Sequence, residues 1–239
     1  MRTPHVVMQV LVAGVAMAIG ATSVSAADPD KDPQMRSLLK DARSLIDSRN
    51  PVAAIEQCDK VTAAFKAAYD GDKRKIYCAR TSEESMLLLL QAAADKKDAV
   101  ALSSVWSDAY FLKSYALQDL GRIDDAQAAI RLALALSPFS SHYLSEQGSI
   151  YLLMKDWPQA LLSFQLAEEQ APLGPAVSKG EEIGRARRGQ GFVFVELGKL
   201  DEAEKKYQQC LATDPKDARA ARELKYVQGL KAKRNSSPK

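Results

Sequence analysis

Few residues of this chain have the types and spacing that catalysis requires. Its two histidines are His5 and His142, and His5 lies in an N-terminal stretch that we expect the mature protein to lose. A histidine-based nucleophile or a multi-histidine metal site would therefore have to be built around His142 alone. We expect His142 to line a groove or the surface and not to act as a catalytic base.

Two further patterns are similar to reactive motifs but lack their context. Gly189-Gln190-Gly191 is spaced like part of a phosphate-binding loop, yet it lies inside an expected helix with no strand before it. The adjacent pair Glu168-Glu169 points about 100° apart on a helix, so it does not form an acid–base pair by itself. We expect the glycines to permit close helix packing, and we predict no enzyme, no cofactor and no metal site.

The three cysteines, Cys58, Cys78 and Cys210, allow at most one intramolecular disulfide. Cys210 occupies a place where a small buried residue is wanted. Cys58 and Cys78 could bridge neighbouring helices and close a loop of about 20 residues, worth roughly 3 kcal/mol. The alternative is that both are buried thiols, and no cysteine spacing matches a zinc or thioredoxin motif.

The strongest pattern is a repeat of 34 residues. Residues 107–140 are followed at once by residues 141–174, with alanine at the twentieth and twenty-seventh places of both rows and proline at the thirty-second. Such a row suits a pair of helices, because helices touch closely only where a side chain is small and because proline ends the second helix. A third row, 184–217, follows an interruption at 175–183.

These rows resemble the tetratricopeptide repeat. The second row matches the repeat pattern closely at Gly148, Tyr151, Ala160, Phe164, Ala167 and Pro172. The resemblance implies an all-α fold, a right-handed α-solenoid in which helical hairpins stack one on the next. Residues 107–232 are expected to form three such repeats and a capping helix.

Weaker copies of the repeat are expected before the three strong rows. We predict degenerate helical repeats over residues 34–106, and the row 73–106 fits worst. Thr81-Ser82-Glu83-Glu84 is a helix-capping pattern in the middle of what should be the first helix of that row. A helix from about Ser82 to Ala94 is expected there whatever surrounds it.

The C-terminal end is expected to close the solenoid. We predict a capping helix from Ala218 to about Lys231, with Arg219, Arg222 and Lys225 keeping one face polar, as a terminal cap requires. Residues 233–239 are expected to be a disordered, solvated tail.

The first 26 residues have the composition of a cleaved signal peptide. Arg2 gives a positive start, Val6 to Ile19 is an almost uncharged apolar run of 14 residues, and Val24-Ser25-Ala26 supplies small residues for cleavage. The run is shorter than the roughly 20 residues of a membrane span, although an uncleaved anchor is the alternative. No cysteine ends the apolar run, so a lipid anchor is not expected. A polar linker at 27–33 follows. We therefore expect a periplasmic or secreted protein without a stable membrane span.

The resemblance also indicates where a partner would bind. The chain has 33 basic and 30 acidic residues, a balance that gives no reason to expect nucleic acid. In tetratricopeptide repeats the second, fifth, ninth and twelfth places of each first helix face a concave groove. The residues that we select at these places are Phe111, Tyr115, Gln118, His142, Ser145, Ser149, Leu152, Arg185, Arg188 and Phe192.

These side chains suit a particular kind of partner. Aromatic groups at one end and the pair Arg185 and Arg188 at the other fit a protein or peptide with an acidic portion. The alternative is that Phe111, Tyr115 and Phe192 are covered by the N-terminal helices of the chain itself. The clamp with which some members of the family grip the C-terminal carboxylate of heat-shock chaperones is missing, because Phe111 and Tyr115 replace its lysine and asparagine.

The sequence therefore predicts an exported, non-enzymatic scaffold for protein–protein interaction in envelope complex assembly. The alternative is an accessory subunit of an envelope enzyme, or an enzyme with a site in the irregular region 73–106.

Export is directly testable. Mass spectrometry of the protein recovered from the cell envelope should show a chain that begins at Ala27 or at a residue beside it, because the small residues before Ala27 suit a signal peptidase. Recovery of the form that starts at Met1 from that fraction would contradict the cleaved signal peptide.

Overall fold

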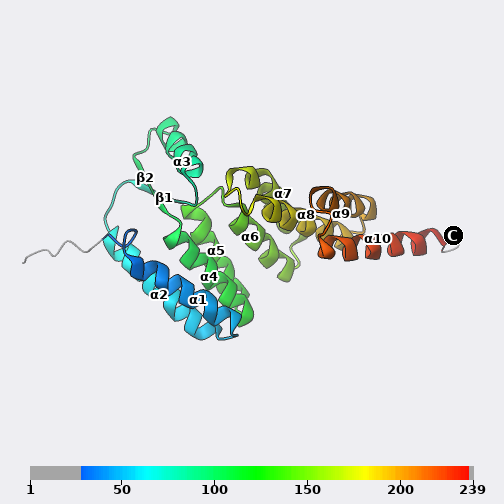
Figure 1. Ribbon diagram of the computed structural model, residues 1–239, viewed down its shortest axis with the longest axis horizontal. Helices are drawn as coiled ribbons and strands as arrows, with labels where there is room; N and C mark the ends of the chain where they lie inside the picture. Colours follow the sequence, from blue (N-terminus) through cyan, green and yellow to red (C-terminus); the bar gives the residue numbers. More distant parts are fainter. Residues whose placement is uncertain (1–27, 237–239) are drawn as a thin grey trace, which may run out of the picture.

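The computed structural model describes residues 28–236, and the predicted signal peptide lies outside this range. Helical hairpins follow one another along an elongated molecule (Figure 1). The elements are α1 (Pro33–Asp47), α2 (Pro51–Ala68), β1 (Lys75–Ala79), α3 (Ser82–Ala94), β2 (Ala99–Ser103), α4 (Val105–Asp119), α5 (Ile123–Leu136), α6 (Ser141–Leu153), α7 (Trp157–Gln170), the 3-10 turn η1 (Ala171–Leu173), α8 (Lys179–Glu196), α9 (Leu200–Thr213) and α10 (Ala218–Ser236). The fold is an all-α solenoid, as predicted, with one small sheet inserted.

The turns inside the hairpins share one geometry. Each contains a residue with positive φ, namely Arg49, Gly121, Lys155 and Gly198. In the first strong repeat the Gly121 N–H donates to Gln118 O and the Arg122 N–H to Leu117 O, both at 2.9 Å, which satisfies carbonyl groups at the end of α4. The same turn between α1 and α2 identifies these two helices as a hairpin of the same kind.

Small residues lie where neighbouring helices touch. Ala160 and Ala167 of α7 are completely buried, and the Phe164 ring between them faces glycines on two other helices. A Cβ atom at Gly148 of α6 would come within 2.8 Å of that ring, and one at Gly189 of α8 within 2.5 Å. These distances leave no room for a larger residue, so the expectation that the α8 glycines permit close packing is confirmed.

The row 73–106 is not a helical hairpin, and the expectation of a helical repeat there was wrong. Strands β1 and β2 pair in parallel, and α3 is the crossover between them. Helix α3 has the predicted bounds because Thr81 caps it, accepting a hydrogen bond from the Glu84 N–H at 3.0 Å. A helix that starts there leaves too little chain before it for a full first helix, and the short flanking segments pair with each other instead. We call β1, α3 and β2 the βαβ unit.

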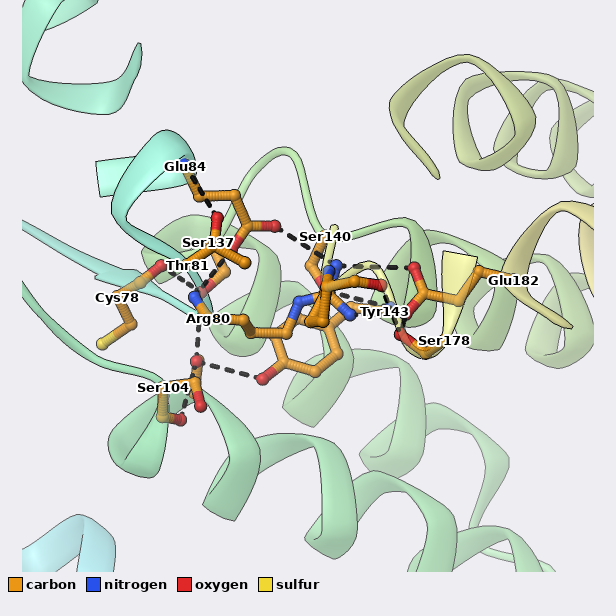
Figure 2. Close-up of polar contacts among 12 residues, drawn as sticks. Cys78, Arg80, Thr81, Glu84, Ser104, Ser137, Ser140, Tyr143, Ser178 and Glu182 are labelled. Atoms are coloured by element: carbon orange, nitrogen blue, oxygen red, sulfur yellow. Dashed lines mark hydrogen bonds and ion pairs between the residues drawn. The ribbon is translucent and has the colours of Figure 1, made fainter. Parts of the chain in front are cut away.

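The βαβ unit is tied to the third strong repeat by a buried cluster around Arg80 (Figure 2). Arg80 Nη1 donates to Glu182 Oε1 of α8 at 2.7 Å, and Arg80 Nη2 donates to Glu84 Oε1 of α3 at 3.2 Å. Ser178 Oγ donates to Glu182 Oε1 at 2.8 Å. Both carboxylates are buried, so these ion pairs are shielded from water and removal of one partner would leave a buried charge.

The cysteines are free and buried. Cys58 of α2 and Cys78 of β1 both belong to the main hydrophobic core, and burial raises the pKa of each thiol to about 12. The possible disulfide between them is therefore absent, and the alternative of two buried thiols describes the structure. Cys210 packs with Ala203 and Tyr207 as a small buried residue, as expected.

The structure shows how the interruption before the third strong row is built, and it corrects the predicted C-terminal tail. Within the interruption at 175–183, residues 179–183 form the first turn of α8 and the preceding residues connect it to η1. Helix α10 continues to Ser236, so residues 233–236 are helical and not a disordered tail. Residues 237–239 lie outside the described range.

The helix contact at Ala160 can be tested by overpacking. Ala160→Leu would insert three carbons into a fully buried contact, which should lower the free energy of unfolding by roughly 1–3 kcal/mol. Ala128→Leu is the matched control, because Ala128 is exposed on α5 and the change should cost less than about 0.5 kcal/mol. Chemical denaturation followed by circular dichroism measures both, and equal losses would contradict the packing described above.

Candidate functional site

The predicted groove residues lie along the first helices of the hairpins, α4, α6 and α8. Four of them, Phe111, Tyr115, His142 and Arg185, line one hollow of about 750 Å³ together with residues of α1 and the turn that follows it. A second hollow, of about 530 Å³, is lined by groove residues of the same three helices, namely Gln118, Ser149, Leu152 and Phe192. The structure therefore brings most of the predicted residues onto one hollowed surface, which we call the groove.

The first hollow has an aromatic floor. The ring centroid of Phe111 lies 4.4 Å from that of His142 and 5.4 Å from that of Tyr143. Tyr143 is fully buried, and its hydroxyl donates to Asp108 Oδ1 at 2.7 Å. The stacked rings are thus held on one side by a buried hydrogen bond, which fixes the floor before any partner arrives.

His142 is uncharged at neutral pH in this setting. Burial, followed by the positive charge of Arg185, lowers the pKa of His142 below its ordinary value. The imidazole therefore offers a stacking surface and one donor, and not a fixed positive charge. This agrees with the expectation of a groove-lining histidine.

The two exposed aromatic residues of the groove are Tyr115 and Phe192. Tyr115 is 44% exposed and Phe192 is 41% exposed, so the N-terminal helices do not cover them. Phe111 is different, because it is buried in the core cluster that also contains Ala42 of α1. The alternative in which N-terminal helices cover the aromatic residues is therefore correct for Phe111 only.

Ser145 is not a groove residue, although it occupies the fifth place of the second row. Its side chain is buried, and its carbonyl accepts a hydrogen bond from Ser149 Oγ at 3.0 Å. The inward position follows from the tight packing of α6, whose neighbouring Leu144 and Glu146 are buried as well. The prediction for Ser145 was wrong for this reason.

Arg185 is engaged inside the protein. It forms an ion pair with Glu146 of α6, and the other carboxylate oxygen of Glu146 accepts a hydrogen bond from Gln118 Nε2 at 2.7 Å. Glu146 is buried, whereas the Arg185 side chain is 30% exposed. The pair therefore satisfies a buried charge at the base of the groove.

Arg188 is engaged still more completely. It forms an ion pair with Asp217, at the start of α10. It forms a second ion pair with Glu181 at 2.8 Å. The Arg188 side chain is only 13% exposed and that of Asp217 only 8%. The two arginines thus join helices of the solenoid, and their charges are already paired inside the protein, so the structure gives no support to the predicted binding of an acidic partner by this pair. The sequence does not show that carboxylates lie opposite them.

The N-terminal hairpin contributes groove residues that were not predicted. Arg43 and Ile46 of α1 line the first hollow. They stand at the ninth and twelfth places of the degenerate row that begins at Met35, so the same rule of places would have found them. Arg49, in the turn after α1, lines the hollow as well and has no equivalent signal.

The described residues also limit the chemistry of the site. Between residues 28 and 236 no cluster of three or more histidine, cysteine, aspartate or glutamate side chains could hold a metal ion. In the same range no helix is both long enough and apolar enough to cross a membrane.

A stack of helical hairpins with a hollowed face on its first helices defines an α-solenoid of the repeat class. Residues 111–175 match the model of the tetratricopeptide repeat, so this part of the chain contains tetratricopeptide repeats, as predicted. No curated protein matches the chain significantly.

Solved structures of similar fold extend over most of the chain. The structure of pilF from Pseudomonas aeruginosa has a TM-score of 0.60 at 13% identity and covers 84% of this chain and 71% of its own. MamA from Desulfovibrio magneticus RS-1 has a TM-score of 0.53 at 13% identity, with coverage of 84% and 87%. A further MamA crystal structure has a TM-score of 0.50 at 20% identity, with coverage of 81% and 84%. At these identities the likeness concerns the fold alone.

The role of Arg188 can be separated from binding. Arg188→Ala removes a buried ion pair with Asp217 and should lower the free energy of unfolding by about 2–3 kcal/mol. Lys205→Ala, at an exposed position of α9, removes the same charge and should change stability by less than about 0.5 kcal/mol. Urea titration measures both variants, and an Arg188→Ala protein as stable as the control would mean that the ion pair contributes nothing.

Proposed function

We propose that the chain is an exported, non-enzymatic scaffold that binds a protein or peptide segment in the groove and takes part in assembling complexes of the cell envelope. The observation that carries this proposal is the exposure of Tyr115 and Phe192 at groove places, each beside a hollow. Exposed aromatic side chains on rigid helices are the groups that contribute most to binding a partner protein.

The groove suits an extended segment better than a small molecule. Its two hollows lie one after the other along α4, α6 and α8, and Tyr115 stands at the first whereas Phe192 stands at the second. A segment that lies across both could place one apolar side chain against each aromatic ring, while Gln118 and Ser149 offer polar groups between them. The helices are already fixed by ion pairs and packing, so binding a segment costs the protein little conformational entropy.

Export to the envelope rests on the predicted signal peptide alone. The enzyme alternative gains no support from the irregular region. Its buried ionisable groups, Arg80 and Glu84, are bound to each other and to Glu182, and the hollow on α3 is lined mainly by apolar side chains such as Met86, Leu87 and Leu90.

The groove proposal is tested by truncating its aromatic anchors. A Tyr115→Ala, Phe192→Ala double variant should capture the partner from envelope extract at least about tenfold more weakly, because each anchor contributes more than about 1 kcal/mol. Leu162→Ala, Leu166→Ala is the matched control, since these exposed leucines stand on α7, the second helix of a hairpin, outside both groove hollows. Quantitative mass spectrometry of the captured proteins, followed by titration of the main one, gives the comparison. Equal capture by both double variants would overturn the groove as the binding surface.

A further inference from the structure

The groove continues onto the capping helix. A row that begins at Ala218 has Arg219, Arg222 and Tyr226 at its second, fifth and ninth places. The two arginines were predicted only to keep one face of a terminal cap polar. Arg219 and Arg222 line a hollow of about 330 Å³ together with Phe192 and Leu152. Residues of α6, α8 and α10 thus form one continuous surface, and Figure 1 shows α10 running on from the last hairpin.

The charges of this surface differ from those deeper in the groove. Arg185 and Arg188 occupy the equivalent places one row earlier. Arg185 forms an ion pair with Glu146, and Arg188 forms ion pairs with Asp217 and Glu181. Arg219 and Arg222 are exposed, and neither guanidinium group has a hydrogen bond or ion pair within residues 28–236. Two free guanidinium groups beside an exposed aromatic ring are therefore available to a ligand.

We propose that Arg219, Arg222 and Phe192 form a subsite for an acidic peptide segment of the partner protein, an inference that rests on the proposed groove function. The two arginines are three residues apart on a helix, so their Cβ atoms lie about 5–6 Å apart. Alternate side chains of an extended peptide lie on one side and are about 6–7 Å apart. Two acidic residues separated by one residue match this spacing, and each carboxylate can form paired hydrogen bonds with one guanidinium group.

The surroundings favour a peptide over a nucleic acid. Glu223 lines the same hollow, and Glu196 lines the neighbouring one. The evenly spaced phosphates of a nucleic acid would be repelled by these carboxylates. A peptide can instead place its acidic residues at the arginines and an apolar residue against Phe192 and Leu152. Glu223 would repel the acidic residues of a peptide bound in this hollow, so its removal should strengthen binding.

The test uses defined probes and needs no identified partner. The first is a short fluorescein-labelled peptide with blocked ends that carries a glutamate–alanine–glutamate pattern followed by leucine. The second peptide has glutamine in place of both glutamates, and the third probe is a labelled single-stranded oligonucleotide. Fluorescence anisotropy is measured with the wild-type chain and with three variants: Arg219→Ala with Arg222→Ala, Lys205→Ala with Lys216→Ala, and Glu223→Gln.

We expect the wild-type chain to bind the glutamate peptide about 5- to 150-fold more tightly than the glutamine peptide. The double arginine variant should lose this difference and leave the glutamine peptide unaffected, Glu223→Gln should strengthen glutamate-peptide binding, and added salt should weaken it. The lysine variant removes the same charge from exposed positions and should match the wild type. Equal binding of the two peptides, an unchanged arginine variant, or tighter binding of the oligonucleotide would each overturn the subsite.

Single aromatic variants separate failure of the acidic subsite from failure of the groove as a binding surface. Phe192→Ala should weaken both peptides, because the ring contacts apolar groups irrespective of charge. If Phe192→Ala and Tyr115→Ala change nothing while the arginine variant still loses the glutamate peptide, Arg219 and Arg222 alone form the acidic subsite, and both the assignment of Phe192 to it and the aromatic groove are wrong. If the aromatic variants weaken binding and the arginine variant does not, the groove stands without the acidic subsite.

Discussion

The close contact of the Phe164 ring with glycines on both of its neighbouring helices is the constraint on which the rest of the structure depends. Because no Cβ atom fits at Gly148 or Gly189, α6, α7 and α8 can approach one another only where the sequence provides glycine. That spacing brings Glu146 within reach of Arg185, and it also sets the separation of the two groove hollows. The groove thus depends on this packing, and Phe164 and Gly189 themselves line the hollow that continues it onto α10.

The repeat pattern predicted the fold because it records packing, and packing depends on residue size at fixed places. It failed at 73–106, where a capping sequence around Thr81 starts a helix in mid-row and the remaining segments are too short for anything but strands. The bounds of α3 were predictable for the same reason, since capping is a local interaction.

The sequence positions that face the groove were predictable. Whether the side chains at those positions are exposed or already paired inside the protein was not. Arg185 and Arg219 both occupy second places, yet Arg185 is bound to a buried glutamate, whereas Arg219 is exposed and has no partner among residues 28–236. The difference depends on what the next helix presents, such as Asp217 opposite Arg188, and these contacts join residues that are far apart in sequence. Ser145 illustrates the same limit, because its place predicts exposure and its neighbours bury it.

The Arg80 cluster changes how the solenoid is expected to come apart. In a simple solenoid each repeat contacts only its neighbours, so the array can unravel from one end. Here Arg80 and Glu182 are 102 residues apart in sequence and are joined directly, which bypasses the two intervening repeats. Fraying of α8 would therefore break the anchorage of the βαβ unit as well, and the N-terminal and C-terminal halves are coupled into one cooperative unit of unfolding.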